Sequence, residues 1–414
     1  MTDKILVTDA EQRKSVPIIR ALGRAGIPVV CGESRRYSMG FYSKYCQRQY
    51  RYPDPEKEDD FIAWLIQHAQ KKAFTILFPI DERTMTPVTR HLELLQKYMQ
   101  VPVVDHSTYM IAHDKSKTIE QARQCNVPIP KTWWFPTLEA FHAKKDLIET
   151  PCMIKPRISS GSRGLRMFRQ REELAEVFLE THKKYPYPLI QDYLPLGGDT
   201  FGVEFLLNQG KVIAFFMHKR LREYPVSGGP STLRESVYDP DLIKTASRLL
   251  TAIRWHGVAM VEFKVDPRDH VPKLMEINPK FWGSIALPIV AGVDFPTLLY
   301  QLAIEEQESL LQPETSLFLP DTTCPVRSLP AQGSLPLVGS YRYPVRCRWL
   351  IPGDILHFIT NPNRFQLNPS FFDFRGEYDD LIDQDDLGPL YGMFLSFLSK
   401  LFTENIWRKY IGRR

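Results

Sequence analysis

Short apolar runs alternate with helix-patterned segments through roughly the first quarter of this 414-residue chain. The apolar runs lie at 4–10, 27–33, 74–80 and 101–105, and the helical segments lie at 15–27, 56–71 and 84–99. Strand–helix alternation with short connections predicts a parallel sheet with helices on both faces. We therefore predict a doubly wound α/β domain over residues 1–105. No GxGxxG follows its first apolar run, so a dinucleotide site is not indicated.

After residue 105 the pattern changes to α+β. Two apolar runs flank a turn at Asn208–Gly210, which is typical of an antiparallel hairpin. Prolines recur every few residues between Gln312 and Tyr343, as in an extended surface connector. Helices are predicted over 114–125, 171–184 and 241–255. The predicted units are 106–310, divided into 106–190 and 191–310, and a C-terminal extension over 311–414.

Composition narrows the class of protein. The formal net charge of +5 is small for this length, so we predict no nucleic-acid partner. The six cysteines form no CxxC and no zinc-site spacing, which favours a reducing compartment. No apolar run is long enough to span a bilayer. The prediction is a cytoplasmic enzyme of two or three units.

Two strand-like runs, VAMVEFKVD and PKLMEINPK, each contain one glutamate, Glu262 and Glu276. Burying an unpaired carboxylate is costly unless a cation or hydrogen bonds compensate it. On a strand, Asn278 and then Lys280 would share the face of Glu276. Carboxylate and amide oxygens on one face suit Mg²⁺, which takes its other ligands from water and phosphate. A pair of salt-bridged strand residues is the alternative.

A second motif, SSGSRG, follows the strand-like CMIKP. A loop of small residues can turn its N–H groups toward phosphate oxygens, and Lys155 stands just before it. No GxxxxGK[ST] is present, so this is not a P-loop. An ordinary turn is the alternative for the loop. Likewise, PLIQDYLP is either a simple buried strand or a strand that presents its backbone to a planar base.

Taken in order, HDKSKT, CMIKP, SSGSRG, IQDYLP, VEFK and EINPKFWGS resemble the nucleotide-site motifs of the ATP-grasp superfamily. The resemblance covers roughly residues 106–300. Within the superfamily, the chain is similar to the carbamoyl-phosphate-synthetase-like carboxylate–amine ligases of the D-aspartate ligase type. This resemblance implies an ATP-grasp fold of two α+β subdomains, preceded by the doubly wound domain.

The resemblance also implies a set of residues that bind ATP and one or two Mg²⁺ ions, with Mn²⁺ as a substitute. Lysines 115 and 155 would bind phosphates, and Lys280 stands where many relatives carry arginine. The loop over the phosphates would comprise Ser160, Gly161, Ser162 and Gly164. The base and ribose would meet Gln191, Tyr193, Leu194 and Asp199, and the metal would be held by Glu262, Glu276 and Asn278, with Lys115, Lys155 and Lys280 supplying positive charge.

Enzymes of this kind activate a carboxylate as an acyl phosphate, which an amine then attacks. For the carboxylate we predict Arg234, with backbone groups of Ser231 and Gly229, because arginine binds carboxylates in a bidentate manner. Either Lys219 or Arg220 would contact phosphate. The alternative for this stretch is a solvated basic loop.

Two further features remain open at this stage. Asp81 and Glu82 follow an apolar run, where they either cap the next helix, which we favour, or meet the ammonium of an amino acid. The 392–414 tail is amphipathic, and we favour a helix packed on its own protein over one lying at the inner membrane face.

The predicted function is an ATP-dependent ligase that joins a small-molecule carboxylate to an amine. The alternatives are a carboxylase that works through carboxyphosphate and a non-catalytic ATP-binding regulatory protein. A homo-oligomer is compatible with all three functions.

Overall fold

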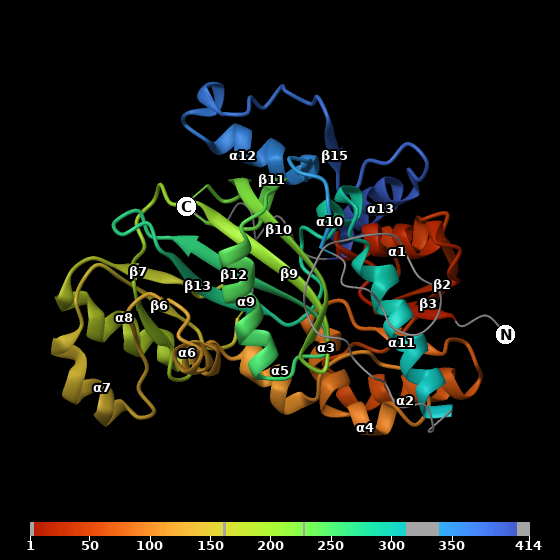
Figure 1. Ribbon diagram of the computed structural model, residues 1–414, viewed down its shortest axis with the longest axis horizontal. Coiled ribbons are helices and arrows are strands. Elements are labelled where there is room, and N and C mark those ends of the chain that lie inside the picture. Colours follow the sequence, from red (N-terminus) through yellow and green to blue (C-terminus); the bar gives the residue numbers. More distant parts are fainter. Residues whose placement is uncertain (1–3, 160–162, 227, 312–338, 404–414) are drawn as a thin grey trace.

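The computed structural model describes residues 4–159, 163–226, 228–311 and 339–403. Three sheets organise the chain (Figure 1). A parallel sheet with its helices forms the N-terminal part, and a long sheet that is antiparallel except for the β14–β15 pair lies beside it. A small sheet with α7 and α8 lies on the far side of the long one. The C-terminal extension runs along one end of the long sheet and back to the N-terminal part (Figure 1).

The N-terminal sheet is parallel, as predicted, and its four strands have the order β3-β2-β1-β4. Its elements are β1 Ile5–Val7, α1 Ser15–Arg24, β2 Val29–Glu33, η1 Met39–Tyr42, β3 Cys46–Arg51, α2 Glu58–Gln70, β4 Ile76–Phe78, α3 Glu82–Arg90 and α4 Leu92–Leu95. Strand β3 is not among the predicted apolar runs. Two other details differ from expectation. The predicted 84–99 helix is interrupted at His91, and the 101–105 run forms no strand. Pro102 lacks the N–H that a ladder needs, and only Gln100 bridges to Ile76.

The next part holds two sheets, ordered β5-β8-β6-β7 and β13-β12-β9-β10-β11-β14-β15. Its first elements are α5 His106–His113, α6 Lys115–Gln124, β5 Thr132–Trp133, α7 Leu138–Lys144, η2 Lys145–Leu147, β6 Cys152–Lys155, β7 Arg166–Phe168, α8 Arg171–Lys184 and β8 Leu189–Asp192. The rest are β9 Thr200–Asn208, β10 Lys211–Glu223, β11 Ser231–Ser236, α9 Pro240–Ala252, β12 Gly257–Val265, β13 Pro272–Asn278, α10 Ala286–Ala291 and α11 Phe295–Leu311. The β9–β10 hairpin turns at Gln209 and Gly210, both at positive φ, which confirms the predicted hairpin.

The C-terminal extension adds two strands to the edge of the long sheet. Its elements are β14 Arg346–Arg348, η3 Leu350–Asp354, α12 Ile355–Thr360, η4 Arg364–Gln366, β15 Glu377–Asp379 and α13 Gly388–Thr403. Helix α13 packs on η1, where a Cβ at Gly392 would lie 2.6 Å from the Tyr42 ring. Lys400 of α13 forms an ion pair with Glu11 at 2.6 Å. The described part of the tail is therefore a helix packed on its own protein, and residues 404–414 lie outside the described residues.

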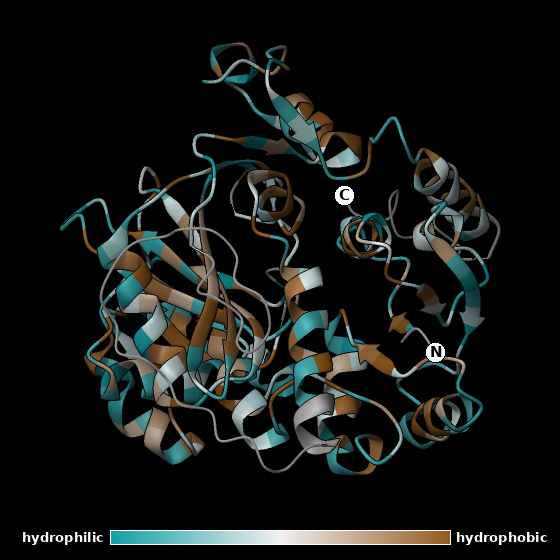
Figure 2. Ribbon diagram, turned by 45° about the vertical axis from the view of Figure 1, so that its right-hand side comes forward, coloured by the Kyte–Doolittle hydropathy of each residue, from teal (hydrophilic) through white to brown (hydrophobic). Residues whose placement is uncertain are grey.

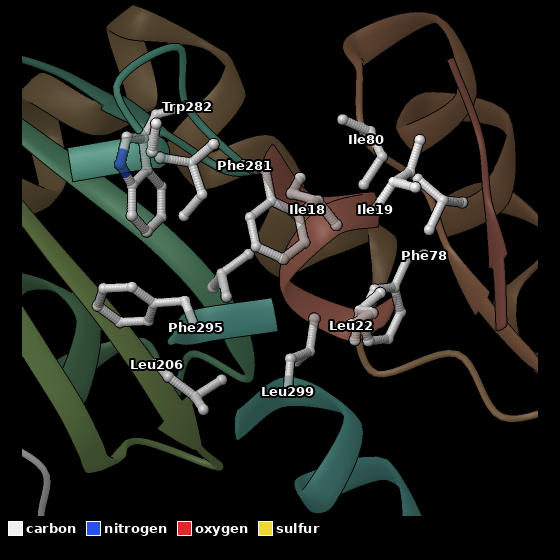
Figure 3. Packing of buried hydrophobic residues seen from close by; sticks show 14 of the residues in the cluster. Ile18, Ile19, Leu22, Phe78, Ile80, Leu206, Phe281, Trp282, Phe295 and Leu299 are labelled. Carbon is white, nitrogen blue, oxygen red and sulfur yellow. The ribbon is translucent and has the colours of Figure 1, made fainter. Parts of the chain in front are cut away.

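A shared hydrophobic core joins the N-terminal domain to the long sheet. Phe281 and Trp282 are buried between α1 and the strands, together with Phe295 and Leu299 (Figure 3). Hydrophobic residues are concentrated in the strands, whereas hydrophilic residues are frequent on the surrounding helices and loops (Figure 2). None of the described helices is both long and apolar enough to cross a membrane.

A buried ionic group ties three parts of the chain together. Asp380, just after β15, forms ion pairs with both Arg234 of β11 and Arg13, which precedes α1. The side chains of Arg234 and Asp380 are at most 1% exposed. The Arg13 guanidinium also lies 4.2 Å from the ring centroid of Trp349. The extension is thus bound to both the long sheet and the N-terminal domain.

Asp380→Asn should destabilise the protein, because it leaves the buried guanidinium of Arg234 and the largely buried one of Arg13 without a counter-charge. Breaking a buried ion pair typically costs about 3–5 kcal/mol. The free energy of unfolding in urea measures this loss. Asp383→Asn is the control, since its partner Arg24 is 43% exposed and such pairs contribute at most about 1 kcal/mol. Equal effects of the two substitutions would contradict the assignment.

Candidate nucleotide and metal site

Two carboxylates lie directly opposite each other in the long sheet. Glu262 of β12 and Glu276 of β13 are register partners in the antiparallel ladder. The Asn278 amide donates to a Glu276 oxygen at 3.3 Å. Directly opposite residues share one face of a sheet, so these three oxygen-bearing side chains gather there. A bulge between Glu262 and Phe263 follows at once, and bulges redirect neighbouring side chains beside active sites.

Two lysines approach these carboxylates from the direction of the small sheet. Lys115, the first residue of α6, has its Nζ 3.6 Å from Glu276 Oε2 and donates to the Ser159 carbonyl at 2.7 Å. Lys155, the last residue of β6, is buried and donates to Gln191 Oε1 at 2.6 Å. Burial, together with the charge of Lys115, lowers the pKa of Lys155 to about 8. The pair supplies positive charge where phosphate oxygens would bind.

Arg220 of β10 compensates one of the carboxylates. Its guanidinium bonds to Glu262 and also donates to the Gly229 carbonyl at 3.3 Å. Burial raises the pKa of Glu262 to about 7, with Arg220 opposing the shift and Glu276 adding to it. Successive strand residues leave opposite faces, so Lys219 points elsewhere and its Nζ lies 2.8 Å from Asp199 Oδ2. Of the two candidates for a phosphate contact, only Arg220 reaches the carboxylates.

The segment with the implied base contacts begins beside Lys155. The Gln191 side chain of β8 joins Lys155 to the Thr132 hydroxyl, to which it donates at 2.9 Å. Leu194 is buried, and its carbonyl accepts from Lys264 at 3.2 Å. The Tyr193 side chain is partly buried. The structure therefore brings Gln191 and Leu194 next to the lysines.

Most of the implied phosphate loop lies outside the described residues, namely Ser160, Gly161 and Ser162. Gly164, its last member, has φ +75°. A Cβ there would lie 2.7 Å from both Pro156 and the Tyr185 ring, so glycine is needed for two independent reasons.

Lys280 has a different neighbour from the one that strand parity predicts. Strand β13 ends at Asn278, so alternation does not extend to Lys280. Its Nζ instead lies 3.4 Å from Glu82 Oε2 at the start of α3. Lys280 thus connects the strand end to the N-terminal domain.

The favoured capping interpretation of Asp81 is wrong for its side chain. Asp81 occupies the position before α3 but makes no capping hydrogen bond with its side chain. Its carboxylate instead pairs with Lys14 at 2.8 Å. Burial alone would raise the pKa of Asp81, but the charges of Lys14 and Lys280 lower it below its ordinary value. Asp81 is therefore held as a carboxylate between two lysines.

Arg234 is not free in a solvated loop. It lies within β11, directly opposite Arg220 of β10, and its guanidinium is bound to Asp380 and 3.4 Å from Cys347 Sγ. The Ser231 hydroxyl donates to the Leu233 carbonyl at 3.1 Å. In this arrangement Arg234 neutralises Asp380, which occupies the place assigned to a substrate carboxylate.

Other residues of the same face were not selected from the sequence. Lys264, two residues after Glu262, is a nearby cation whose pKa is lowered by burial. Gly202 pairs in register with both Glu262 and His218, and a Cβ there would lie 2.4 Å from the His218 ring. His218 in turn lies 2.5 Å from buried Glu204. The alternation of Glu262 and Lys264 was a usable signal, whereas the pairing of β9 with β10 and β12 was needed to find the histidine.

Glu262 and Glu276 lie within the part of the chain that matches a known protein family. A family model described as "ATP-grasp in the biosynthetic pathway with Ter operon" matches residues 184–319. The D-aspartate ligase of Enterococcus faecium (strain Aus0004) is 23% identical over 252 residues. That match spans 55% of this chain and 59% of the relative.

Solved structures agree over a longer stretch. Biotin carboxylase of Campylobacter jejuni, in complex with β,γ-ATP, superimposes with a TM-score of 0.62 at 17% identity, covering 73% of this chain and 70% of that one. This chain has the ATP-grasp fold. An L-amino acid ligase of Bacillus licheniformis gives 0.58 at 18% identity, covering 73% and 74%. N5-carboxyaminoimidazole synthetase of Staphylococcus aureus gives 0.58 at 14%, covering 73% and 77%. The resemblance to the ATP-grasp superfamily is confirmed.

The affinity of this ATP-grasp site for Mg-ATP should peak between about pH 7 and pH 8. The family resemblance implies that Glu262 binds the metal, and below its pKa of about 7 protonation would remove that ligand. The resemblance likewise implies that Lys155 binds phosphate, and above its pKa of about 8 deprotonation would remove this charge. Each limb should approach roughly tenfold per pH unit for one linked proton. Calorimetric titration across this range measures both limbs.

Matched variants assign the two limbs. Glu262→Gln should abolish the acidic limb, and Lys155→Met should abolish the alkaline limb while weakening binding. An acidic limb that persists in Glu262→Gln would belong to the nucleotide itself and would contradict the assignment.

Proposed function

We propose that this chain is an ATP-dependent carboxylate–amine ligase that acts on a small carboxylate, in particular an amino acid. The observation that carries the proposal is the facing arrangement of Glu262, Glu276 and Asn278 with Lys115 and Lys155. The two carboxylates would bind a divalent cation, and the two lysines beside them would bind the phosphate oxygens that accompany it.

The donor set fits a hard divalent cation. Among the described residues, no three His, Cys, Asp or Glu side chains form a metal-binding group. Two carboxylates and one amide match the incomplete protein ligation that Mg²⁺ accepts when phosphates and water complete its shell. Glu262, Glu276 and Asn278 would hold one or two ions, and Mn²⁺ would be a substitute. When bound, the metal would neutralise charge on the transferring phosphoryl group.

The chain's own residues would position and neutralise the reactants. Lys115 and Lys155 would bind phosphate oxygens, and Gln191 would hold Lys155 in place through its 2.6 Å hydrogen bond. Arg220 would release Glu262 to the metal and turn toward the transferring phosphoryl. Such positioning supplies most of the rate enhancement in phosphoryl transfer. The carboxylate substrate would become an acyl phosphate, which the amine attacks with loss of phosphate.

The proteins that this chain resembles favour a ligase over a carboxylase. A relative found by sequence is a D-aspartate ligase, and a structure of similar fold is that of an L-amino acid ligase. Biotin carboxylase and N5-carboxyaminoimidazole synthetase share the same fold, so a carboxylase remains the second candidate. The two differ in the acid that is activated, which is organic in one and bicarbonate in the other.

Hydroxylamine trapping should yield a hydroxamate from one amino acid of a panel, with ADP released in step. Glu276→Gln should lower this rate by about 10²-fold or more, because it removes charge stabilisation at the transferring group. Glu235→Gln is the control, since Glu235 of β11 pairs with Arg346 at 2.7 Å and should leave the rate within about twofold.

Two other results would each overturn the ligase. ADP release that requires bicarbonate, without an organic hydroxamate, would establish the carboxylase. Tight Mg-ATP binding without turnover on any acid would establish an ATP-binding protein with a regulatory role.

A further inference from the structure

A cavity of about 370 Å³ lies between the N-terminal domain and the C-terminal extension. One side of it is charged and the other is apolar. The charged side includes Asp9, Glu11, Arg13, Glu33, Arg35 and Arg83, and Lys400 of α13 also lines the cavity. The apolar side includes Met39, Trp349, Ile351, Leu381, Met393 and Phe397. A cavity of this size accommodates a small organic ligand with a polar head and an apolar body.

The charged side lies where parallel strands end. Asp9 follows β1 and Glu33 ends β2, and ligands of open α/β sheets bind at the carboxyl ends of their strands. Asp9 is only 5% exposed, and its φ of +53° is unusual for a residue with a side chain. Backbone strain of this kind often accompanies a functional position.

One oxygen of the buried Asp9 carboxylate is available to a ligand. Its Oδ2 accepts from the Thr8 hydroxyl, the Thr84 hydroxyl and the Asp81 N–H, at 2.7, 2.5 and 3.0 Å. Its Oδ1 accepts no hydrogen bond from the part of the chain that the structure describes. Asp9 lines the cavity, so an ammonium group bound there could donate to this oxygen in a charge-assisted hydrogen bond.

Arginines at the same cavity suit a carboxylate. Arg35 is exposed and makes no hydrogen bond or ion pair with the described residues. Arg83 also lines the cavity and pairs with Asp54, which is 47% exposed and so easily displaced by solvent or ligand. A guanidinium matches a carboxylate in a planar, bidentate geometry. Asp9 and Arg35 line the same cavity, and they offer partners of the kind that an ammonium group and a carboxylate require.

The apolar side comes mainly from the extension. Phe397 and Met393 belong to α13, and Ile351 belongs to η3. Phe397 is 54% exposed although it lies on a helix packed against the protein. These side chains would contact an aliphatic or aromatic side chain of the ligand and remove it from water.

Short chains of contacts join this cavity to the nucleotide site. Arg13 of the cavity shares Asp380 with Arg234, which lies opposite Arg220, the partner of Glu262. A second route starts at Asp9, which accepts from the Asp81 N–H. Asp81 pairs with Lys14, and Lys14 donates to the Phe281 carbonyl next to Lys280.

We propose that this cavity binds a free α-amino acid with an apolar side chain, with its ammonium at Asp9 and its carboxylate at Arg35. The assignment of this amino acid as a substrate rests on the ligase function proposed above. Binding of the amino acid to the cavity does not depend on that function.

Two matched pairs of variants test the cavity by calorimetric titration with leucine and phenylalanine, each as both enantiomers. Phe397→Asp and Arg35→Glu place charge of the wrong kind in the cavity and should weaken binding roughly tenfold or more. Phe394→Asp and Arg36→Glu are the controls, because Phe394 is 56% exposed on the same helix and Arg36 is the exposed neighbour of Arg35, and neither lines the cavity. The controls should bind within about twofold of the parent chain, and all four should bind Mg-ATP equally.

Equal affinities within both pairs would overturn the proposal, as would failure of the parent chain to bind any of these amino acids at about 10 mM with Mg-ATP present. The hydroxamate assay separates this result from the proposed function. Hydroxamate formation with equal affinities within the pairs leaves the ligase intact and removes the cavity. A clear difference within the pairs without ADP release supports the cavity and removes the ligase.

Discussion

Two like charges placed opposite each other in an antiparallel ladder repel, and the arrangement around Glu262 and Glu276 depends on how this repulsion is compensated. Arg220 compensates one carboxylate from the neighbouring hairpin, and Lys115 approaches the other from the start of α6. Lys155 adds a third cation from the small sheet. The carboxylates therefore require three separate elements to converge, and this convergence is the basis of the metal and phosphate site that we propose.

The compensation is also what makes the site responsive to ligands. The Arg220 guanidinium is bound to Glu262, and burial raises the pKa of that carboxyl to about 7. A divalent ion competes with both the guanidinium and the proton. Burial lowers the pKa of Lys155, and a bound phosphate would raise it again and so favour the charged ammonium form. Metal and phosphate would therefore each favour the charged form of the side chain that binds them.

The C-terminal extension changes the use of the adjoining basic strand. Arg234 resembles a substrate-binding arginine in the sequence, yet its guanidinium is bound to Asp380 within the protein. Arg13 is bound to the same carboxylate from the N-terminal domain. The extension consequently closes one side of the molecule and contributes the apolar wall of a cavity whose charged wall belongs to the first sheet.

Sequence by itself predicted most of the alternating elements of the first domain and the shared strand face of Glu276 and Asn278. Alternation of apolar and helical segments sufficed for the parallel sheet, and strand parity sufficed for Glu276 and Asn278, because both are local properties of the backbone. Parity failed at Lys280, where the strand has already ended. The capping interpretation failed at Asp81, because Lys14 competes for its carboxylate. Only the tertiary structure decided which cation meets which carboxylate, since Arg220, Arg234 and Arg13 have equivalent chemistry and differ only in which distant acid folding brings within reach.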